Sequence, residues 1–403
     1  MRERQTLLHI NRRNFLTLAG ASAAWCSFGR LALAAAPTEQ RFVFIMLRGA
    51  MDGLTAVPPL FDPAFAGARG KLAMGGPDAA CLPLDGQFAL HPALANLHKL
   101  YTARQALVIH AVASPYRERS HFDAQDILES GMGAAHAAQS GWLGRALIEL
   151  HNVKGLAVGQ NVPLALRGAT EVSSWSPSVL PEPDSDLLQR LDDLYRHDAV
   201  LAPALHEAQA ASEIADDAMD GTMGGGKRGG KNFAVLAKAA GNFLASPDGP
   251  RLAMLEVGGW DTHAGQGTVK GRLALNLKQL DDGLGALQSA LGTAWRHTTV
   301  LCATEFGRTV AANGTGGTDH GTGGAAFLLG AAVTGGRVIA DWPGLAPNQL
   351  YQGRDLRPTL DIRAVMKGLL ASQYGIETAA LAQHIFPDSD SIKPLRDLVV
   401  SKG

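Results

Sequence analysis

Continuous apolar runs alternate with segments of helical periodicity along most of the chain. Residues 41–47 (RFVFIML) are apolar almost throughout, which is typical of a strand buried on both faces of a sheet. Residues 273–291 instead carry apolar side chains every three or four positions, which indicates an amphipathic helix. Further strands are predicted at residues 106–111, 251–257, 299–303, 325–329 and 337–340, with two short ones between 155 and 168; further helices are predicted at 92–101, 120–128, from 141 onward, within 177–213, at 233–245 and at 360–370.

This alternation predicts the fold class. It favours an α/β fold with a mainly parallel sheet and helices on both faces. The 403 residues include 46% hydrophobic residues, enough for a large core, and residues 37–403 are predicted to form one large domain. Within it, the glycine-rich residues 216–232 are predicted to be a mobile loop or lid.

Polar residues follow several predicted strands. Asp52 follows the first strand, Ser120 follows the strand at 106–111, and Glu305 follows the strand at 299–303. If the sheet is parallel, the carboxyl ends of its strands share one edge, where open α/β sheets bind ligands. We therefore expect these residues to meet there, although turn chemistry alone would explain an aspartate before Gly53.

Asp261 and His263 follow the strand at 251–257 and are two residues apart. In an extended chain such residues point the same way, so both can bind one ion. A carboxylate with an imidazole suits zinc, manganese or iron better than calcium. The alternative is a hydrogen-bonded pair that braces the loop.

Residues 305–330 (EFGRTVAANGTGGTDHGTGGAAFLLG) link two predicted strands through a glycine-rich loop. The glycines allow the backbone to approach a ligand closely, and the loop carries several ionisable side chains. A salt-bridged surface turn is the alternative. Across the chain, the predicted metal ligands are Asp52, Asp261, His263, Glu305, Asp319 and His320.

Ser120 is the candidate nucleophile. Ser120 and Asp123 have the spacing of a helix capping box. A hydroxyl at a helix N-terminus lies among free N–H groups, which suit an anion and can activate a nucleophile, but serine is also a favoured cap without any catalytic role. Arg119 and Arg308, with Arg48, are candidates to clamp a tetrahedral anion, because guanidinium groups pair with such anions bidentately.

Charge and cysteine content exclude two classes of protein. The formal net charge is -1 and no basic stripe occurs, so nucleic-acid binding is not expected. The chain has three cysteines, and Cys302 lies inside a predicted buried strand, so no disulfide framework is indicated.

Residues 1–36 have the layout of an export signal. The segment 11–16 (NRRNFL) resembles a twin-arginine motif, an apolar stretch follows, and residues 32–34 (ALA) fit a small-residue cleavage site. The apolar stretch is short and Arg30 interrupts it, so no permanent membrane span is expected. The resemblance implies folded export by the twin-arginine translocase and a periplasmic or exported location.

Six segments of the chain resemble a known family. LRGAMDGL, RSHFDAQD, GWLGR, GGWDTHAGQ, TEFGRTVAANGTGGTDHG and DLRPTLD resemble an exported bacterial family known as domain of unknown function 1501, and they cover nearly all of the mature chain. The order of strand–Asp, helix-capping Ser, Asp-x-His, strand–Glu and Asp-His-Gly is similar to that of the alkaline phosphatase-like superfamily, which includes sulfatases.

The resemblance to the superfamily implies residue roles. Asp52 takes the place of the first-strand metal aspartate, and Ser120 that of the nucleophile. Asp261, His263 and His320 resemble one metal site, and Glu305 resembles the carboxylate of a second. The sequence departs from the superfamily pattern in two places, since phenylalanine follows Glu305 where the superfamily often has histidine, and the aspartate–histidine spacing at 261–263 is short. A single-metal or degenerate site is therefore expected.

The sequence thus leads to two functional hypotheses. The first is a hydrolase of a small anionic phosphate or sulfate ester that depends on a divalent metal, zinc or manganese. The second is a catalytically degenerate metal- or ligand-binding periplasmic protein of the same fold.

Overall fold

The fold was analysed in a computed structural model of the chain. The structure describes residues 38–76, 79–169, 172–177, 185–219 and 233–400. The predicted export signal, residues 1–36, lies outside the described residues, as do residues 220–232 of the predicted glycine-rich loop. Residues 216–219, predicted to begin that loop, are instead the end of a helix.

A nine-stranded sheet forms the centre of the molecule. Its strands run in the order β10-β4-β9-β8-β1-β7-β5-β6, and β11 pairs with β4. Eight strands point the same way, and β9 alone pairs antiparallel with both of its neighbours. The strands are β1 (Arg41–Leu47), β4 (Ala106–Ala113), β5 (Gly155–Val158), β6 (Val172–Trp175), β7 (Leu252–Val257), β8 (Thr298–Thr304), β9 (Gly324–Leu329), β10 (Val338–Ile339) and β11 (Leu360–Asp361), with a separate hairpin of β2 (Leu82–Pro83) and β3 (Ala89–Leu90).

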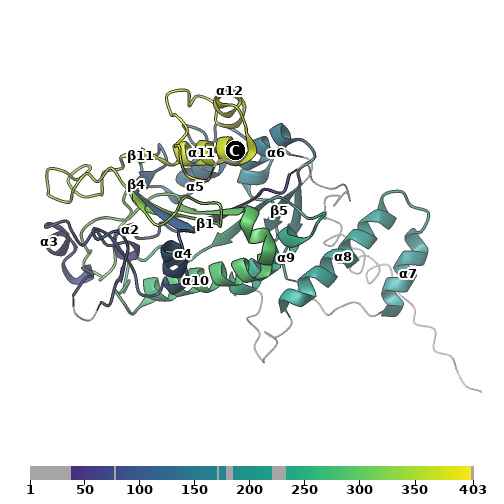
Figure 1. The fold of residues 1–403 in the computed structure, drawn as a ribbon, viewed down its shortest axis with the longest axis horizontal. Coiled ribbons are helices and arrows are strands. Elements are labelled where there is room, and N and C mark those ends of the chain that lie inside the picture. The colour runs from purple at the N-terminus through teal and green to yellow at the C-terminus, as the bar shows by residue number, and fades with distance from the viewer. Residues whose placement is uncertain (1–37, 77–78, 170–171, 178–184, 220–232, 401–403) are drawn as a thin grey trace, which may run out of the picture.

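Helices cover both faces of the sheet (Figure 1). Successive side chains of a strand point to opposite faces, so β1 contributes Val43 and Ile45 to one core and Phe42 and Phe44 to the other. α4 (Ala95–Thr102), α9 (Phe233–Ala245) and α10 (Arg272–Leu291) pack on the first face, and α5 (His121–Ser130), α6 (Trp142–Leu150) and α11 (Ile362–Tyr374) on the second. The predicted α/β fold, mainly parallel with helices on both faces, is confirmed.

The remaining elements lie around this three-layer centre. α7 and α8 extend from the side of the molecule beyond α9 (Figure 1). These elements are α2 (Gly53–Ala56), α3 (Phe65–Arg69), α7 (Ser185–Tyr195), α8 (Leu201–Met219) and α12 (Thr378–Ala380), the 3-10 helices Gly70–Leu72, Leu164–Leu166 and Gly292–His297, and the π-helix Leu381–Ile385.

Two predictions of local structure need correction, and one strand was not predicted. The second short strand predicted within 155–168 is the 3-10 helix Leu164–Leu166. The helix predicted from residue 360 begins two residues later, because Leu360–Asp361 pairs with β4 and Asp361 then caps α11 by accepting a hydrogen bond from the Arg363 amide. The strand β6 was not predicted, since its sequence (VSSW) is too short and polar to stand out.

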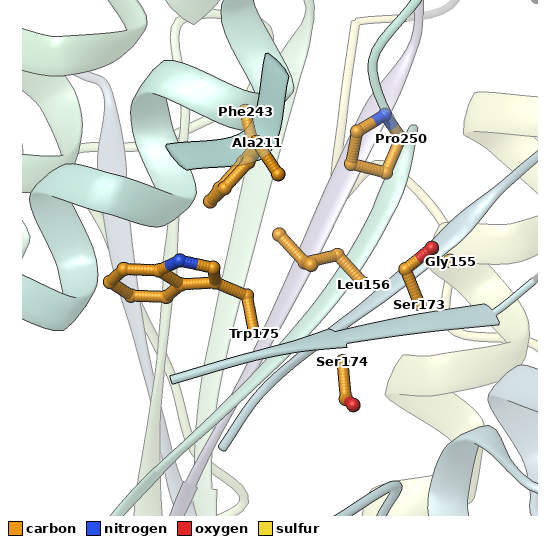
Figure 2. Close-up of a pocket in the computed structure, with 8 residues that line it drawn as sticks. All are labelled: Gly155, Leu156, Ser173, Ser174, Trp175, Ala211, Phe243 and Pro250. Atoms are coloured by element: carbon orange, nitrogen blue, oxygen red, sulfur yellow. The ribbon is translucent and has the colours of Figure 1, made fainter. Parts of the chain in front are cut away.

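A small apolar pocket lies where the edge of the sheet meets α8 and α9. Leu156, Trp175 and Phe243 line it (Figure 2), and its volume is about 10 Å³. A volume of this size holds about one water molecule, so the pocket offers no room for a ligand. No helix in the described part of the chain is both long and apolar enough to cross a bilayer.

Candidate metal centre

Because β9 runs antiparallel to β8, both ends of the loop between them lie at one edge of the sheet. β1, β4, β7 and β8 all end at this edge, and β9 begins there because it runs the opposite way. The loop that leaves β8 at Glu305 therefore returns to the same edge, where His320 precedes β9. A backbone bridge between Arg308 and His320 holds the two arms of this loop together.

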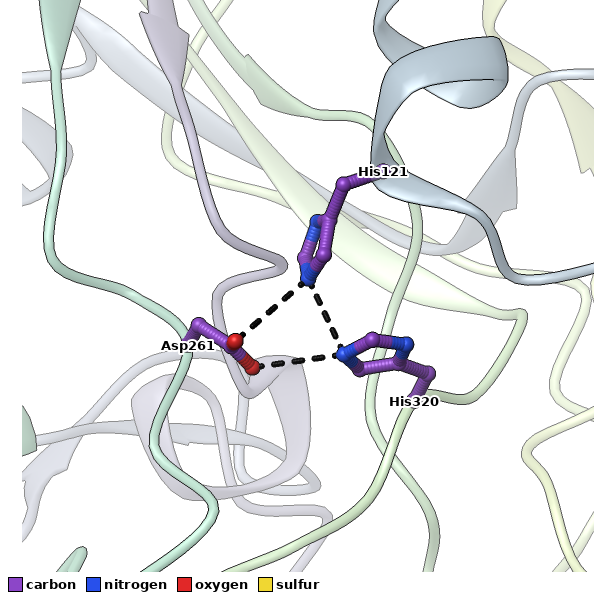
Figure 3. A group of neighbouring side chains, drawn as sticks. All are labelled: His121, Asp261 and His320. Atoms are coloured by element: carbon purple, nitrogen blue, oxygen red, sulfur yellow. Dashed lines mark hydrogen bonds and ion pairs between the residues drawn. The ribbon is translucent and has the colours of Figure 1, made fainter.

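Three side chains from three separate segments of the chain meet at this edge (Figure 3). The Nε2 atoms of His121 and His320 are 3.0 Å apart. Asp261 places Oδ1 3.4 Å from Nε2 of His320 and Oδ2 3.6 Å from Nε2 of His121. The ligand atoms of all three residues lie within 4.8 Å of one another, which is close enough for them to bind one ion.

His263 adds a fourth donor atom to this cluster. Its Nε2 lies 2.9 Å from Nε2 of His320 and 3.0 Å from Oδ1 of Asp261. We call His121, Asp261, His263 and His320 the four-residue cluster. It draws on the start of α5, the loop after β7 and the loop before β9, so only the completed sheet assembles it.

The other nitrogen of each ring has a hydrogen-bond partner that can only accept. Nδ1 of His121 lies 2.7 Å from Oε1 of Glu305, and Nδ1 of His263 lies 3.1 Å from Oδ1 of Asp319. Nδ1 of His320 lies 3.0 Å from the backbone carbonyl oxygen of Arg119. In the neutral rings, Nδ1 must therefore carry the hydrogen, and each Nε2 presents a lone pair to the cluster.

Glu305 is buried behind His121. Its Oε1 also accepts hydrogen bonds from Gln125 Nε2 at 3.0 Å and from the Gly49 amide at 2.8 Å. Burial alone would raise the pKa of Glu305, but the hydrogen bonds from His121 and Gln125 outweigh it and hold the pKa below its usual value. Glu305 is therefore charged at neutral pH, and the same hydrogen bond raises the pKa of His121.

Gly49 lies where two loops touch at the back of the cluster. Its φ is 118°, and a Cβ there would lie 2.7 Å from the backbone nitrogen of Asp261. Only glycine combines this backbone conformation with so close an approach. The loop after β1 thus supports Asp261 and donates to Glu305 at once.

Arg308 holds the carboxylate of the cluster. Arg308 is 1% exposed, and Nη1 donates to Oδ1 of Asp261 at 2.6 Å, while Nε donates to Thr318 Oγ1 at 3.1 Å. Burial would raise the pKa of Asp261, but the hydrogen bond and the charge of Arg308 keep it below its usual value. Burial lowers the pKa of His320, and the nearby charge of His121 lowers it further, so His320 is neutral at pH 7.

Arg119 acts on the cluster through its backbone. Its φ of 64° lies in the left-handed region, and its carbonyl accepts from His320. Its guanidinium donates from Nε and Nη2 to Oδ2 of the buried Asp355, at 2.9 and 2.7 Å. This half-buried ion pair holds the residue in a backbone conformation that is costly for a non-glycine residue.

Ser120 is the N-cap of α5, directly before His121. Its backbone is extended, but its hydroxyl makes no hydrogen bond to the first backbone N–H groups of the helix. Asp123, predicted to complete the capping box, accepts from the Tyr116 hydroxyl at 3.0 Å instead. Gly131 closes the helix in the left-handed conformation.

The structure does not bring all predicted metal ligands together. It unites Asp261, His263 and His320, and it places Glu305 and Asp319 one hydrogen bond further out, against Nδ1 of two histidines. Asp52 lies elsewhere. Its buried carboxylate pairs with Arg69 and also accepts from Thr55 Oγ1 at 2.8 Å and from Gln266 Nε2 at 2.6 Å.

His121 was not among the predicted ligands. It follows Ser120 in the motif RSHFDAQD, where the capping pattern favours the serine as the functional residue. Its position in the chain could have identified it, because a histidine in the first helical turn after a strand lies at the same edge of the sheet as the other candidates. Gln125, one turn further on, belongs to the same pattern, since it shares Glu305 with His121.

Comparison with solved structures finds remote similarities in fold. The chain is similar to the lipoteichoic acid synthase LtaP from Listeria monocytogenes, with 10% identity, coverage of 93% of this chain and 82% of that chain, and a TM-score of 0.41. A 2-O GAG sulfatase is 11% identical, the match covers 88% of this chain and 73% of that chain, and the TM-score is 0.40. Alkaline phosphatase from the Antarctic bacterium TAB5 is 13% identical, the match covers 74% of this chain and 94% of that chain, and the TM-score is 0.37. At these values the similarities say nothing about what this chain acts on.

Comparison of the sequence itself is more specific. No curated protein matches the chain. The family described as "Protein of unknown function (DUF1501)" matches residues 103–385, which hold all members of the four-residue cluster and well over half of the chain. The chain therefore belongs to the DUF1501 family, as its sequence motifs predict.

Proposed function

We propose that the four-residue cluster binds one divalent metal ion, zinc or manganese, and that the protein uses it to hydrolyse a small phosphate or sulfate ester. One observation carries this proposal. Three Nε2 lone pairs and a carboxylate converge, with the neighbouring Nε2 atoms only 2.9 and 3.0 Å apart. When the rings are neutral, their Nε2 lone pairs cannot hydrogen-bond to one another, whereas a cation satisfies all four ligand atoms together. A proton on His121 would satisfy its contact with His320 but not the contact between His263 and His320.

The donor set fits the proposed ion. Imidazole nitrogen and carboxylate oxygen are the ligands that zinc and manganese share, and a hydrogen-bonded partner behind each histidine is the usual support of such ligands. His121, Asp261, His263 and His320 would hold the ion. When bound, it supplies charge stabilisation for an ester oxyanion and lowers the pKa of a coordinated hydroxyl.

Ser120 is the proposed nucleophile. It precedes His121 at the start of α5, a place that favours an anion, and its hydroxyl has no capping bond to lose. Its oxygen attacks phosphorus or sulfur, the bond to the alcohol oxygen breaks, and the alcohol leaves with the proton that the serine hydroxyl gives up. Water then releases the phosphate or sulfate from the serine, so one water is consumed in each cycle.

Metal analysis and an ester assay on the purified protein test this proposal. We expect one equivalent of metal and turnover of aryl phosphates or sulfates. His320→Gln should lose the metal, and Ser120→Ala should keep the metal and lose turnover. His206→Gln, at an exposed histidine of α8, is the matched control and should change neither. If the metal-loaded protein shows no turnover and Ser120→Ala changes nothing, the proposed hydrolase activity is wrong.

A metal-binding protein without catalysis is the second candidate, and one observation favours it. Two of the three arginines predicted to clamp an anion, Arg119 and Arg308, already donate to Asp355 and Asp261. Vanadate, an analogue of the tetrahedral anion, separates the candidates. Binding of vanadate that needs the metal supports the hydrolase, whereas metal binding without any vanadate binding supports the second candidate.

We also propose that the chain is exported folded through the twin-arginine translocase to the periplasm. The paired Arg12 and Arg13, the apolar stretch and the small-residue site support this. Replacing both arginines by lysine should leave the protein in the cytoplasm, while the same change at Arg2 and Arg4 should not. Periplasmic delivery of the Arg12→Lys, Arg13→Lys variant would contradict the proposed route.

A further inference from the structure

A polar cavity opens at the same edge of the sheet, beside the ends of β1, β5 and β7. Its volume is about 290 Å³. Arg48 after β1, Glu256 near the end of β7 and the loop after β5 line it. This volume is close to the lower end of the range of about 300–1,000 Å³ for small-molecule sites, so the cavity can take one small organic group.

Hydrogen bonds join this cavity to the four-residue cluster. Nη1 of Arg48 donates to Oε1 of Gln125 at 2.6 Å, and Nε2 of Gln125 donates to Oε1 of Glu305 at 3.0 Å. The same Glu305 oxygen accepts from Nδ1 of His121 at 2.7 Å. Three consecutive hydrogen bonds therefore connect the wall of the cavity to a member of the cluster, through Gln125 and the buried Glu305.

The charges around the cavity balance. Nη2 of Arg48 lies 2.6 Å from Oε1 of Glu129 and 2.6 Å from Oε1 of Glu256, so two carboxylates share one guanidinium. Arg167 brings a second cation to the lining and donates from Nε to the Val162 carbonyl. Glu129 is buried and does not line the cavity, but its charge compensates Arg48, so two cations are balanced by two anions and no net charge is left to select a charged ligand of either sign.

The remaining lining suits an uncharged group with many hydroxyls. Gln160 and Asn161 are exposed and offer both donors and acceptors, and the Glu256 carboxylate can accept from a hydroxyl. Val158 and Met254 supply an apolar wall for carbon-bound hydrogens. A sugar ring presents this combination of alternating hydroxyl donors and acceptors on an apolar frame.

We propose that the cavity binds a neutral sugar unit, and that this unit is part of the ester substrate of the four-residue cluster. The second half of the statement rests on the proposed function, but the binding of the sugar does not. Glu256 and Asn161 are the specificity-determining residues of the cavity. Hydroxyls donate to the carboxylate of the first and exchange hydrogen bonds with the amide of the second.

Titration calorimetry on the full protein tests the binding alone. The probes are five neutral disaccharides (sucrose, trehalose, maltose, cellobiose and lactose), with citrate and spermidine as charged probes. At least one disaccharide should bind saturably, and neither charged probe should compete with it. Glu256→Gln should weaken binding roughly tenfold, because a hydrogen bond to a charged group is lost, and Asn161→Leu should weaken it as well. Glu377→Gln, at an exposed acid beside α12, is the matched control.

The outcomes for the cavity and for the hydrolase are separable. Saturable sugar binding that needs Glu256, without any ester turnover, supports the proposed sugar site and contradicts the proposed hydrolase activity. Ester turnover with no saturable binding of any disaccharide contradicts the proposed sugar site and supports the proposed hydrolase activity. Equal affinities for the Glu256→Gln and Glu377→Gln variants, or stronger binding of citrate or spermidine in the cavity, also overturn it.

Discussion

Two buried or half-buried groups of polar side chains lie after the strands of this sheet, and they differ in how their polar atoms are satisfied. Around Asp52, each carboxylate oxygen meets hydrogen-bond donors, from Arg69, Thr55 and Gln266 among others. In the four-residue cluster, lone pairs face one another instead. The first group is complete within the protein, whereas the second presents ligand atoms that a cation would satisfy, so a position after a strand does not by itself identify a ligand site.

The Asp52 group should contribute to stability and not to metal binding. Asp52→Ala leaves Arg69 buried without its partner, and we expect a loss of about 3–5 kcal/mol of unfolding free energy. Urea unfolding measures this loss, and metal titration of the folded variant should match wild type. A variant of normal stability that has lost its metal would reverse the assignment of the two groups.

His110 sharpens the comparison, because it is buried near Asp52 and titrates without a metal. Nε2 lies 3.0 Å from the Val57 carbonyl, Nδ1 accepts from the Ala111 amide, and burial lowers the pKa to about 4. The unfolded chain binds a proton below about pH 6.5 and the folded chain does not, so stability falls as the pH drops from about 6.5 to about 4.

The size of this pH effect follows from the pKa difference. At about 1.4 kcal/mol per pKa unit, His110 accounts for a loss of roughly 3 kcal/mol at the acid end. Unfolding free energies at pH 7.5 and pH 4.5 for wild type and His110→Gln isolate this contribution. The two proteins should differ less at pH 4.5 than at pH 7.5, and an unchanged difference would contradict a buried neutral histidine.

Glu305 belongs to the second group and should affect the metal more than the fold. Glu305→Gln keeps the shape but removes the charged acceptor of His121, so we expect metal affinity to fall about 10–100-fold. Calorimetric titration with zinc measures this change. Glu149→Gln, which removes the acceptor of His384 far from the cluster, should leave the affinity as it is.

Asp319 should show the smallest effect of the series. It accepts from His263 as Glu305 does from His121, but its side chain is 53% exposed, so water can replace it. Asp319→Asn should lower zinc affinity by less than about tenfold. A loss larger than that of Glu305→Gln would show that Asp319 binds the ion directly, as the sequence predicts.

The hydrophobic pattern predicts much more of the fold than of the site. Fully buried strands such as β1 and β8 are recognisable because both faces are apolar, and the helix α9 has the bounds that its sequence predicts. The direction of β9 is not encoded in such a pattern, since an apolar run reads the same in either direction. That direction is what brings His320 to the edge where His121 lies.

The ion-pair partner of each carboxylate decides whether it is structural or a candidate ligand, and that partner depends on the tertiary structure. The sequence shows Asp52 and Asp261 in equivalent places after a strand, but Arg69 and Arg308, which meet them, come from distant segments. Arg69 was not singled out from its sequence, because one arginine in a loop carries no signal. The buried partners, more than the strand ends, separate a structural carboxylate from a candidate ligand.

The dispersal of the four-residue cluster along the chain has a consequence for when an ion can enter it. The candidate ligands at 121, 261, 263 and 320 lie on segments that adjoin only after the strands have paired. A nascent or unfolded chain offers no preformed set of donors, so capture of the ion has to follow folding. If the chain crosses the membrane already folded, the ion supply of the compartment where it folds decides which metal it carries out.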